Sequence, residues 1–217
     1  MLAVSGGKRQ REREERERRE RMLAAARRYA ALGWPVTPGA QVGADRACSC
    51  DRIGCPDPAA HPASGAWGFQ ASADAAVLGL RWADRPEANV ILPTGRVFDV
   101  LDVPAAAGAA ALERMAADGA PAGPVADVAG ERYLFFVATR GAPADEDEWW
   151  SCHLDTSPET DAEVPGIRWH CRDSYVLAPP SALPYGREVS WIRPPDGEPL
   201  PDPLRVLEVL SDCCEAV

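Results

Sequence analysis

The sequence lacks any long apolar run, and none of its apolar stretches approaches the ~20 residues that a membrane-spanning helix needs. It also lacks the apolar segment of a signal peptide, because charged side chains crowd positions 8–21. These two absences predict a cytoplasmic protein without a membrane role. Because that compartment is reducing, we do not expect the seven Cys to form disulfides as their main role.

Lysine is nearly absent, and one Lys beside 22 Arg is typical of GC-rich coding such as that of actinobacteria. The 217 residues carry a net charge of −10 and offer enough material for one sizeable core. Residues 1–30 hold ten basic and five acidic side chains, which leaves 13 basic and 28 acidic, or −15, in the rest. Such a body repels polyanions on average, so a nucleic-acid function must overcome that repulsion.

Residues 10–32 contain no helix breaker and are rich in Arg, Glu and Ala, which predicts a long N-terminal helix. Glu and Arg spaced four apart support it, as in Glu12 with Arg16. Gly33 and the following Trp-Pro predict its end. We interpret residues 1–22 as a charged, solvated helical extension, with an arm that binds nucleic acid or a protein partner as the alternative.

The rest of the chain carries both strand and helix patterns. Apolar runs predict strands at 34–38, 89–92, 97–103, 133–138, 167–170, 175–177 and 189–192. Ser72 is predicted to cap a helix that runs to about 84. Further helices are predicted over 105–118, with Gly119 as the stop signal, and after the Pro-rich stretch at 194–203.

Cys48, Cys50, Cys55 and His61 fall within fourteen residues, and their number and type match a closed tetrahedral zinc site. Two prolines in the same loop reduce the entropy lost when the ligands are held together. The pattern predicts a structural zinc that staples the loop and leaves no open position for catalysis. The alternative is a reduced Cys-rich loop or a decayed metal site.

The other cysteines form weaker patterns. Cys152-His153 and His170-Cys171 would make a second site only if the two segments were neighbours, which their spacing does not require. We interpret them as isolated strand or loop residues. Cys213 and Cys214 are adjacent thiols without further pattern.

Four segments in order carry a family resemblance. They are ALGWPV at 31–36, CSCDRIGCPDPAAHP at 48–62, WADRPEANVILPTG at 82–95 and SYVLAPPSALPYG at 174–186. Together they resemble the primase-polymerase (prim-pol) domain of the archaeo-eukaryotic primase superfamily. The resemblance covers residues 23–195 and leaves 196–217 as a Pro-rich linker and C-terminal helix. It implies an α+β fold with mixed sheets flanked by helices.

The resemblance also implies nucleotidyl transfer, in which magnesium or manganese ions held by carboxylates activate a primer hydroxyl and steady a triphosphate. The family places two acids as Asp-x-Asp, since residues two apart on a strand point to the same face. Asp102 matches the first acid, and Pro104 takes the place of the second. Asp99 is a doubtful substitute, because it faces the other side of a strand unless a bulge intervenes.

Two further motifs depart from the family. Its Gly-Gly-x-His-Leu-Tyr-Phe pattern, whose His contacts the incoming nucleotide, aligns with residues 130–136 and places Tyr133 at the His. Its third carboxylate aligns with Arg168. Tyr has no ring nitrogen and Arg repels a metal ion. The three substitutions predict a degenerate active site in which Asp102 is a remnant.

The cleft can still bind phosphate, because Arg binds phosphate without a metal. The predicted nucleotide-binding residues are Arg132, Tyr133, Arg168, Arg172 and Ser181. In the alternative interpretation, these Arg pair with the acidic body and residues 179–181 form a rigid turn.

Two other functions stay open. An active DNA primase/polymerase would use Asp99, Asp102 and the acidic residues at 145–148 with magnesium or manganese. A regulatory or structural interaction protein without a nucleic-acid role would suit the acidic body.

Overall fold

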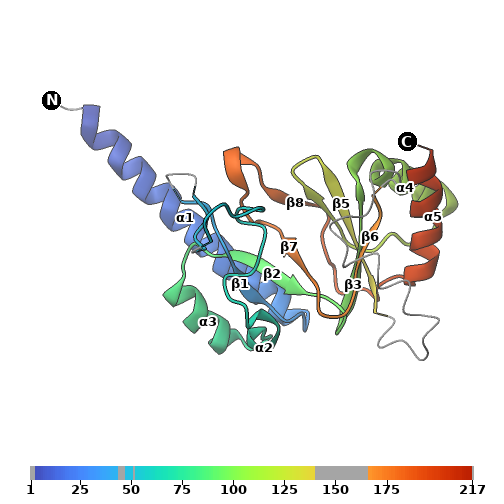
Figure 1. Cartoon of the computed structure of the whole chain (residues 1–217), viewed down its shortest axis with the longest axis horizontal. Helices are drawn as coiled ribbons and strands as arrows, with labels where there is room; N and C mark the ends of the chain where they lie inside the picture. The colour runs from blue at the N-terminus through green and yellow to red at the C-terminus, as the bar shows by residue number, and fades with distance from the viewer. Residues whose placement is uncertain (1–2, 44–46, 51, 140–165, 217) are drawn as a thin grey trace. The chain divides into compact units, whose positions relative to one another are not determined.

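The computed structural model describes residues 3–43, 47–50, 52–139 and 166–216. It divides the chain into two compact units, Met1–Leu92 with Pro180–Arg187 and Pro93–Pro179 with Glu188–Val217 (Figure 1). The α+β class expected from the resemblance is confirmed, and the ladders inside each unit are antiparallel. No helix within the described ranges is long and apolar enough to cross a membrane.

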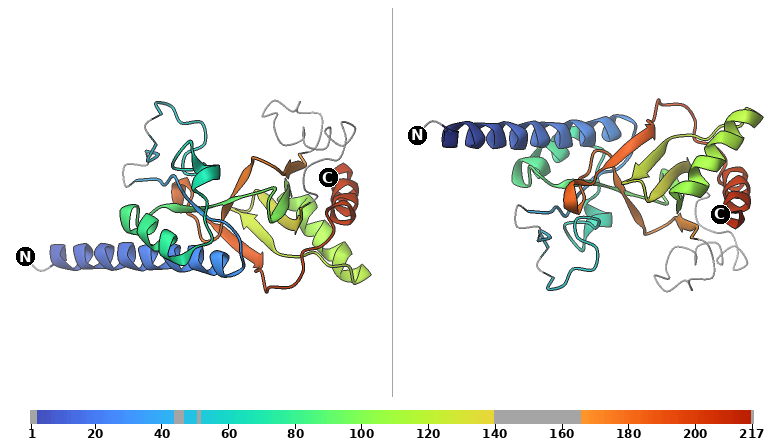
Figure 2. Two further views of the ribbon diagram at one scale, coloured as in Figure 1. Left: turned by 90° about the horizontal axis from the view of Figure 1, so that it is seen from below. Right: turned by 90° about the horizontal axis from the view of Figure 1, so that it is seen from above.

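The first unit begins with the long helix α1, Ala3–Ala31, which is drawn as one continuous helix in Figure 2. Most described side chains between positions 9 and 21 are exposed. From Met22 onward an apolar stripe that includes Ala26 and Tyr29 is buried. The Tyr29 ring stacks on Trp34 with 6.1 Å between centroids, which fixes the chain where the helix ends.

Short elements complete the first unit, with β1 at Thr37–Gly39, α2 at Trp67–Gln70, α3 at Ala75–Asp84 and β2 at Asn89–Pro93. Strand β1 pairs antiparallel with β2. The prediction that Ser72 caps α3 is wrong. The N-cap is Asp74, whose carboxylate accepts hydrogen bonds from the backbone N–H groups of Ala76 and Val77 at 2.7 and 3.1 Å. An Asp in that position satisfies two otherwise unpaired donors of the first turn. The segment 180–187 contributes a 3-10 turn at Pro184–Gly186.

The second unit is built on a five-stranded antiparallel sheet in the order β6-β3-β5-β4-β8. Its strands are β3 Phe98–Pro104, β4 Val125–Val128, β5 Arg132–Ala138, β6 Arg168–His170 and β8 Val189–Arg193. Strand β7, Tyr175–Ala178, follows β6 in the chain. Strand β4 was not predicted, because four residues interrupted by Asp127 carry too little apolar pattern.

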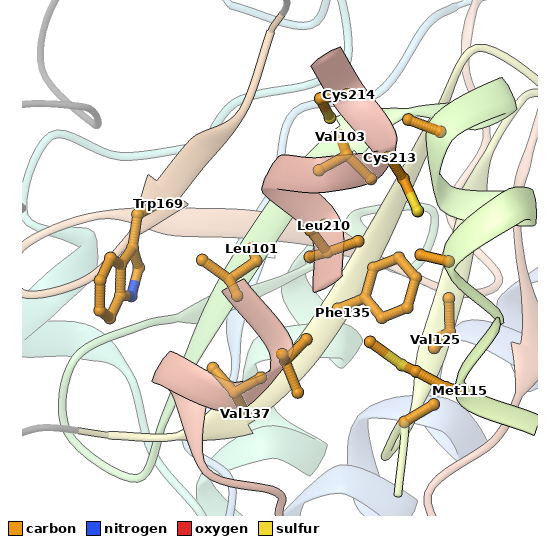
Figure 3. Close-up of a cluster of buried hydrophobic side chains, with 14 of the residues drawn as sticks. Leu101, Val103, Met115, Val125, Phe135, Val137, Trp169, Leu210, Cys213 and Cys214 are labelled. Carbon is orange, nitrogen blue, oxygen red and sulfur yellow. The ribbon is translucent and has the colours of Figure 1, made fainter. Parts of the chain in front are cut away.

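Two helices, α4 at Ala105–Asp118 and α5 at Pro203–Glu215, pack against one face of this sheet. Leu101, Val103 and Phe135 from the sheet meet Leu210 and Cys213 of α5 in one buried cluster (Figure 3). Helix α4 ends at Gly119, whose φ of +65° gives the left-handed cap that the sequence predicted.

The opposite face of the sheet carries the alternate residues. Strands β3 and β5 pair without interruption from Phe98 opposite Ala138 to Pro104 opposite Arg132. Because side chains alternate along a strand, Asp102 shares the face opposite the helices with Phe98 and Pro104. On that face the Phe136 ring lies 5.3 Å from Phe98 and 5.2 Å from Trp191. This regular register determines which of the candidate site residues lie on the same face of the sheet.

Candidate functional site

Asp102 is the centre of a group of charged side chains on the face opposite the helices. Its side chain is only 7% exposed, and Arg132 Nε donates to its Oδ1. Arg168 Nη1 and His170 Nε2 lie 3.8 and 3.5 Å from its other oxygen. A buried carboxylate needs such partners, because the desolvation of an isolated charge is costly. Asp102 is thus surrounded by two guanidinium groups and an imidazole.

Arg132 is also tied down by backbone carbonyls. Its Nη2 donates to Asp102 O at 3.0 Å and to Gly166 O. Arg132 is opposite Pro104 in the ladder, so its side chain lies on the same face as Asp102 and Pro104.

Asp99 does not join Asp102. The uninterrupted ladder contains no bulge at this point, and the three-residue spacing sends the Asp99 side chain to the helix face. There Trp169 Nε1 donates to Asp99 Oδ2 at 3.3 Å. The two carboxylates that the sequence offers on β3 thus lie on opposite faces of the sheet.

Tyr133 also lies on the helix face, where it packs against the buried core. It leaves no room for a side chain at Gly108, since a Cβ there would be 2.6 Å from the Tyr133 ring. The adjacent Arg132 has its side chain on the Asp102 face. Neighbouring residues of a strand point to opposite faces, so Arg132 and not Tyr133 shares the face of Asp102.

The short strand β6 supplies the other polar groups. Arg168 is opposite Asp102 in the ladder, and 57% of its side chain is exposed. His170 Nδ1 lies 3.0 Å from Ser174 Oγ, so the ring connects a hydroxyl with the Asp102 carboxylate. Arg172 has 68% of its side chain exposed and lies 3.8 Å from Asp173. The structure thus brings Arg132 and Arg168 together, with a histidine that the sequence treated as isolated.

Ser181 lies in the first unit and is fully buried. Val90 N donates to Ser181 Oγ at 2.9 Å. Beside it, Asn89 Nδ2 donates to the carbonyls of Ala59 and Ala182 at 3.0 and 2.8 Å, and Asn89 Oδ1 accepts from Ala182 N at 3.0 Å. These bonds fasten the segment 180–187 to β2, and Asn89 links it to the metal loop. Apart from an Asn before a strand, no sequence pattern indicated this network.

The predicted metal ligands of the first unit do come together. The ligand atoms of Cys48, Cys50, Cys55 and His61 all lie within 4.8 Å of one another. His61 Nε2 is 3.3 Å from Cys48 Sγ and 3.4 Å from Cys55 Sγ, close to the separation of about 3.5 Å expected between N and S ligands of a tetrahedral zinc. Across the described ranges, no other group of three such residues has this arrangement.

The surroundings of the cluster prepare it for a metal. His61 Nδ1 lies 2.8 Å from Pro62 O, and a proton shared with that carbonyl leaves Nε2 to face the thiols. The Ala59 N–H points to Cys48 Sγ at 3.4 Å. A hydrogen bond from the Arg52 backbone lowers the pKa of Cys50, whereas burial raises the pKa of Cys55. The donor set therefore fits a soft divalent ion such as zinc.

Some of the predicted features lie outside the described residues. These are Cys152, His153 and the acidic residues at 145–148. Cys171 is buried on the second unit, and the pKa of buried Cys214 is raised by desolvation.

A comparison with protein families finds one family that covers most of the chain. The model of the Prim-Pol family, described as bifunctional DNA primase/polymerase, N-terminal, matches residues 26–204. No curated protein matches the chain significantly.

Proposed function

Because the chain belongs to the Prim-Pol family of bifunctional DNA primase/polymerase N-terminal domains, we propose that it is a primase/polymerase-like protein with a degenerate two-metal site. In this proposal it binds the phosphates of a nucleotide or nucleic acid and does not turn them over. The observation that carries the proposal is the ion pair between Arg132 and Asp102.

The loss of catalysis follows from the charges around Asp102. Two-metal catalysis needs several carboxylate oxygens around the ions. Here Asp99 is on the other face, Pro104 has no ligand atom, and Arg132 already neutralises Asp102. A divalent cation would have to displace a guanidinium from a buried carboxylate, and Arg168 adds a second repulsive charge 3.8 Å away.

The binding role follows from the cations that remain accessible. Arg168 keeps more than half of its side chain exposed, and its contact with Asp102 is long. Arg172 extends from the turn after β6 and is exposed as well. Arg132, Arg168 and Asp102 leave one positive charge in excess, whereas the charge of Arg172 is balanced by the neighbouring Asp173. Guanidinium groups recognise phosphate oxygens directly, so the site needs no metal to bind an anion.

The test is calorimetric titration of the full chain with deoxyadenosine triphosphate, in EDTA and in magnesium. We expect the same affinity in both, and a loss of about tenfold in Arg168→Ala, which corresponds to one charge-assisted contact. Arg205→Ala is the matched control, because it removes an exposed Arg from α5 on the helix face. Binding that requires magnesium, or that Arg205→Ala weakens equally, would contradict the proposal.

We propose further that Cys48, Cys50, Cys55 and His61 bind one structural zinc. Four protein ligands close the coordination sphere, so this ion would stabilise the loop and have no catalytic step. If magnesium or manganese has a role, it belongs to the alternative of an active primase/polymerase, in which the acids at 145–148 would have to complete the site.

A further inference from the structure

We propose that the turn Thr94-Gly95 positions the anion-binding side chains, by clamping the turn 171–174 that follows β6. The functional part of this inference rests on the proposed function. Both turns belong to the second unit. The clamp acts through backbone contacts, so Thr94 and Gly95 are positioning residues that need not touch a ligand.

Strand β6 needs an anchor. It is the edge strand of the sheet and has only three residues, which pair with Val100, Leu101 and Asp102 of β3. Yet it carries both Arg168 and His170. A short edge strand that pairs on one side has few hydrogen bonds to hold it, and its ends fray readily. The positions of Arg168 and His170 therefore depend on how firmly the following turn is held.

Thr94 holds both ends of that turn. It is 2% exposed, and its Oγ1 donates to Cys171 O at 2.6 Å. Its backbone N–H donates to Ser174 O at 2.9 Å. One buried residue thus supplies a side-chain bond at the start of the turn and a backbone bond at its end, which fixes the distance between them.

Gly95 makes the fit so close that no other residue is accommodated. Its φ is +79°, and a Cβ at this position would lie 2.3 Å from Arg172 Cα and 2.4 Å from Arg172 N. These atoms are backbone, so they cannot turn aside as the end of a side chain can. Any larger residue must push the turn, and with it Arg172, away from β3.

The turn 171–174 also fixes the orientation of the His170 ring. Ser174 ends the turn, and its hydroxyl lies 3.0 Å from His170 Nδ1. That contact orients the ring so that Nε2 faces Asp102 Oδ2 at 3.5 Å. A displacement of Ser174 would release the ring and change the tautomer that the two contacts select.

The experiment follows the His170 imidazole by ¹⁵N NMR in the full chain, with the signal assigned from His170→Gln. We expect Gly95→Ala and Thr94→Val to shift both ring-nitrogen resonances of His170. Thr94→Ser keeps the hydroxyl, so its His170 resonances should stay at the wild-type positions. Gly119→Ala is the matched control, because Gly119 has a φ of +65° but no atom within 4 Å of its added Cβ. It introduces similar backbone strain without touching the turn.

The same variants are titrated with deoxyadenosine triphosphate in EDTA, where we expect roughly tenfold weaker binding for Gly95→Ala and wild-type affinity for Gly119→Ala. Unshifted His170 signals in folded Thr94→Val and Gly95→Ala would overturn the clamp, whatever binds. If Gly95→Ala does not fold, Thr94→Val and Thr94→Ser decide the same question. Absence of binding by the wild type, with shifted His170 signals in the variants, would overturn the proposed function and leave the clamp supported.

Discussion

Arg132 donates from Nε to Oδ1 of Asp102, while its backbone pairs with Pro104 two residues further along β3. In the proposed function, Asp102 is the remaining acid of a former two-metal site, and Arg132 is a cation beside Pro104, where the second acid would be. The carboxylate is buried and the guanidinium is 22% exposed, so each partner lowers the desolvation cost of the other.

The first prediction concerns this ion pair. Arg132→Gln leaves the buried Asp102 with weaker partners, and we expect the free energy of unfolding to fall by about 2 kcal/mol. Asp102→Asn in the same chain should recover much of that loss, because no buried charge then remains. Urea unfolding of the wild type, both single variants and the double variant measures the coupling. Additive effects of the two substitutions would contradict a direct ion pair.

The second prediction restores the missing acid. Pro104 is the N-cap of α4 and makes no side-chain cap bond, so Pro104→Asp supplies a favoured capping residue and keeps the fold. With Arg132→His in the same chain, Asp102 and the new carboxylate share a face without an intervening guanidinium.

We expect this double variant to bind Mn²⁺ at least tenfold more tightly than the wild type in a calorimetric titration. Pro104→Asn with Arg132→His is the isosteric control and should gain clearly less, because it lacks the second carboxylate. Equal Mn²⁺ affinity of the wild type and the Asp variant would show that Arg132 and Pro104 do not prevent metal binding.

The third prediction separates structural from ligand-binding roles around Asn89. Asn89→Ala removes the three side-chain hydrogen bonds of buried Asn89 to Ala59 and Ala182, and we expect the free energy of unfolding to fall by about 3 kcal/mol. Ser181→Ala should cost about 1 kcal/mol, since it removes the hydroxyl that accepts from Val90 N at 2.9 Å and donates weakly to Val90 O at 3.3 Å. Exposed Gln70→Ala is the control and should stay within about 0.5 kcal/mol of the wild type in urea unfolding. Wild-type stability of Asn89→Ala would argue against the network.

The fourth prediction concerns the metal loop. Elemental analysis of the purified chain should give about one zinc per molecule, and Cys55→Ser should lose it, because three ligands bind zinc far more weakly than four. Cys213→Ala removes a buried thiol outside the loop and should retain the metal. A wild type that folds fully without metal, or a Cys55→Ser variant that keeps a full complement of zinc, would refute the site.

Local patterns predicted much of the fold. The end of α4 at Gly119 and the convergence of the four metal ligands depend on neighbours in sequence, which periodicity and spacing report directly. The separation of Asp99 from Asp102 also followed from strand alternation.

Features that depend on distant segments could not be predicted in the same way. The hydrogen bonds of Asn89 join residues up to 93 positions apart, and no local pattern encodes such a contact. The motif around Tyr133 drew attention to that residue, and only the strand register shows that the adjacent Arg132 shares the face of Asp102. The partnership of His170 with Ser174 depends on the turn that Thr94 clamps.

Primer extension tests the central claim most directly. The full chain is incubated with a primed template, labelled deoxynucleotides and magnesium or manganese, beside Asp102→Ala. A degenerate two-metal site predicts no incorporation by either protein above a protein-free blank. Incorporation by the wild type that Asp102→Ala abolishes would contradict the account, because Asp102 would then act in catalysis while paired with Arg132.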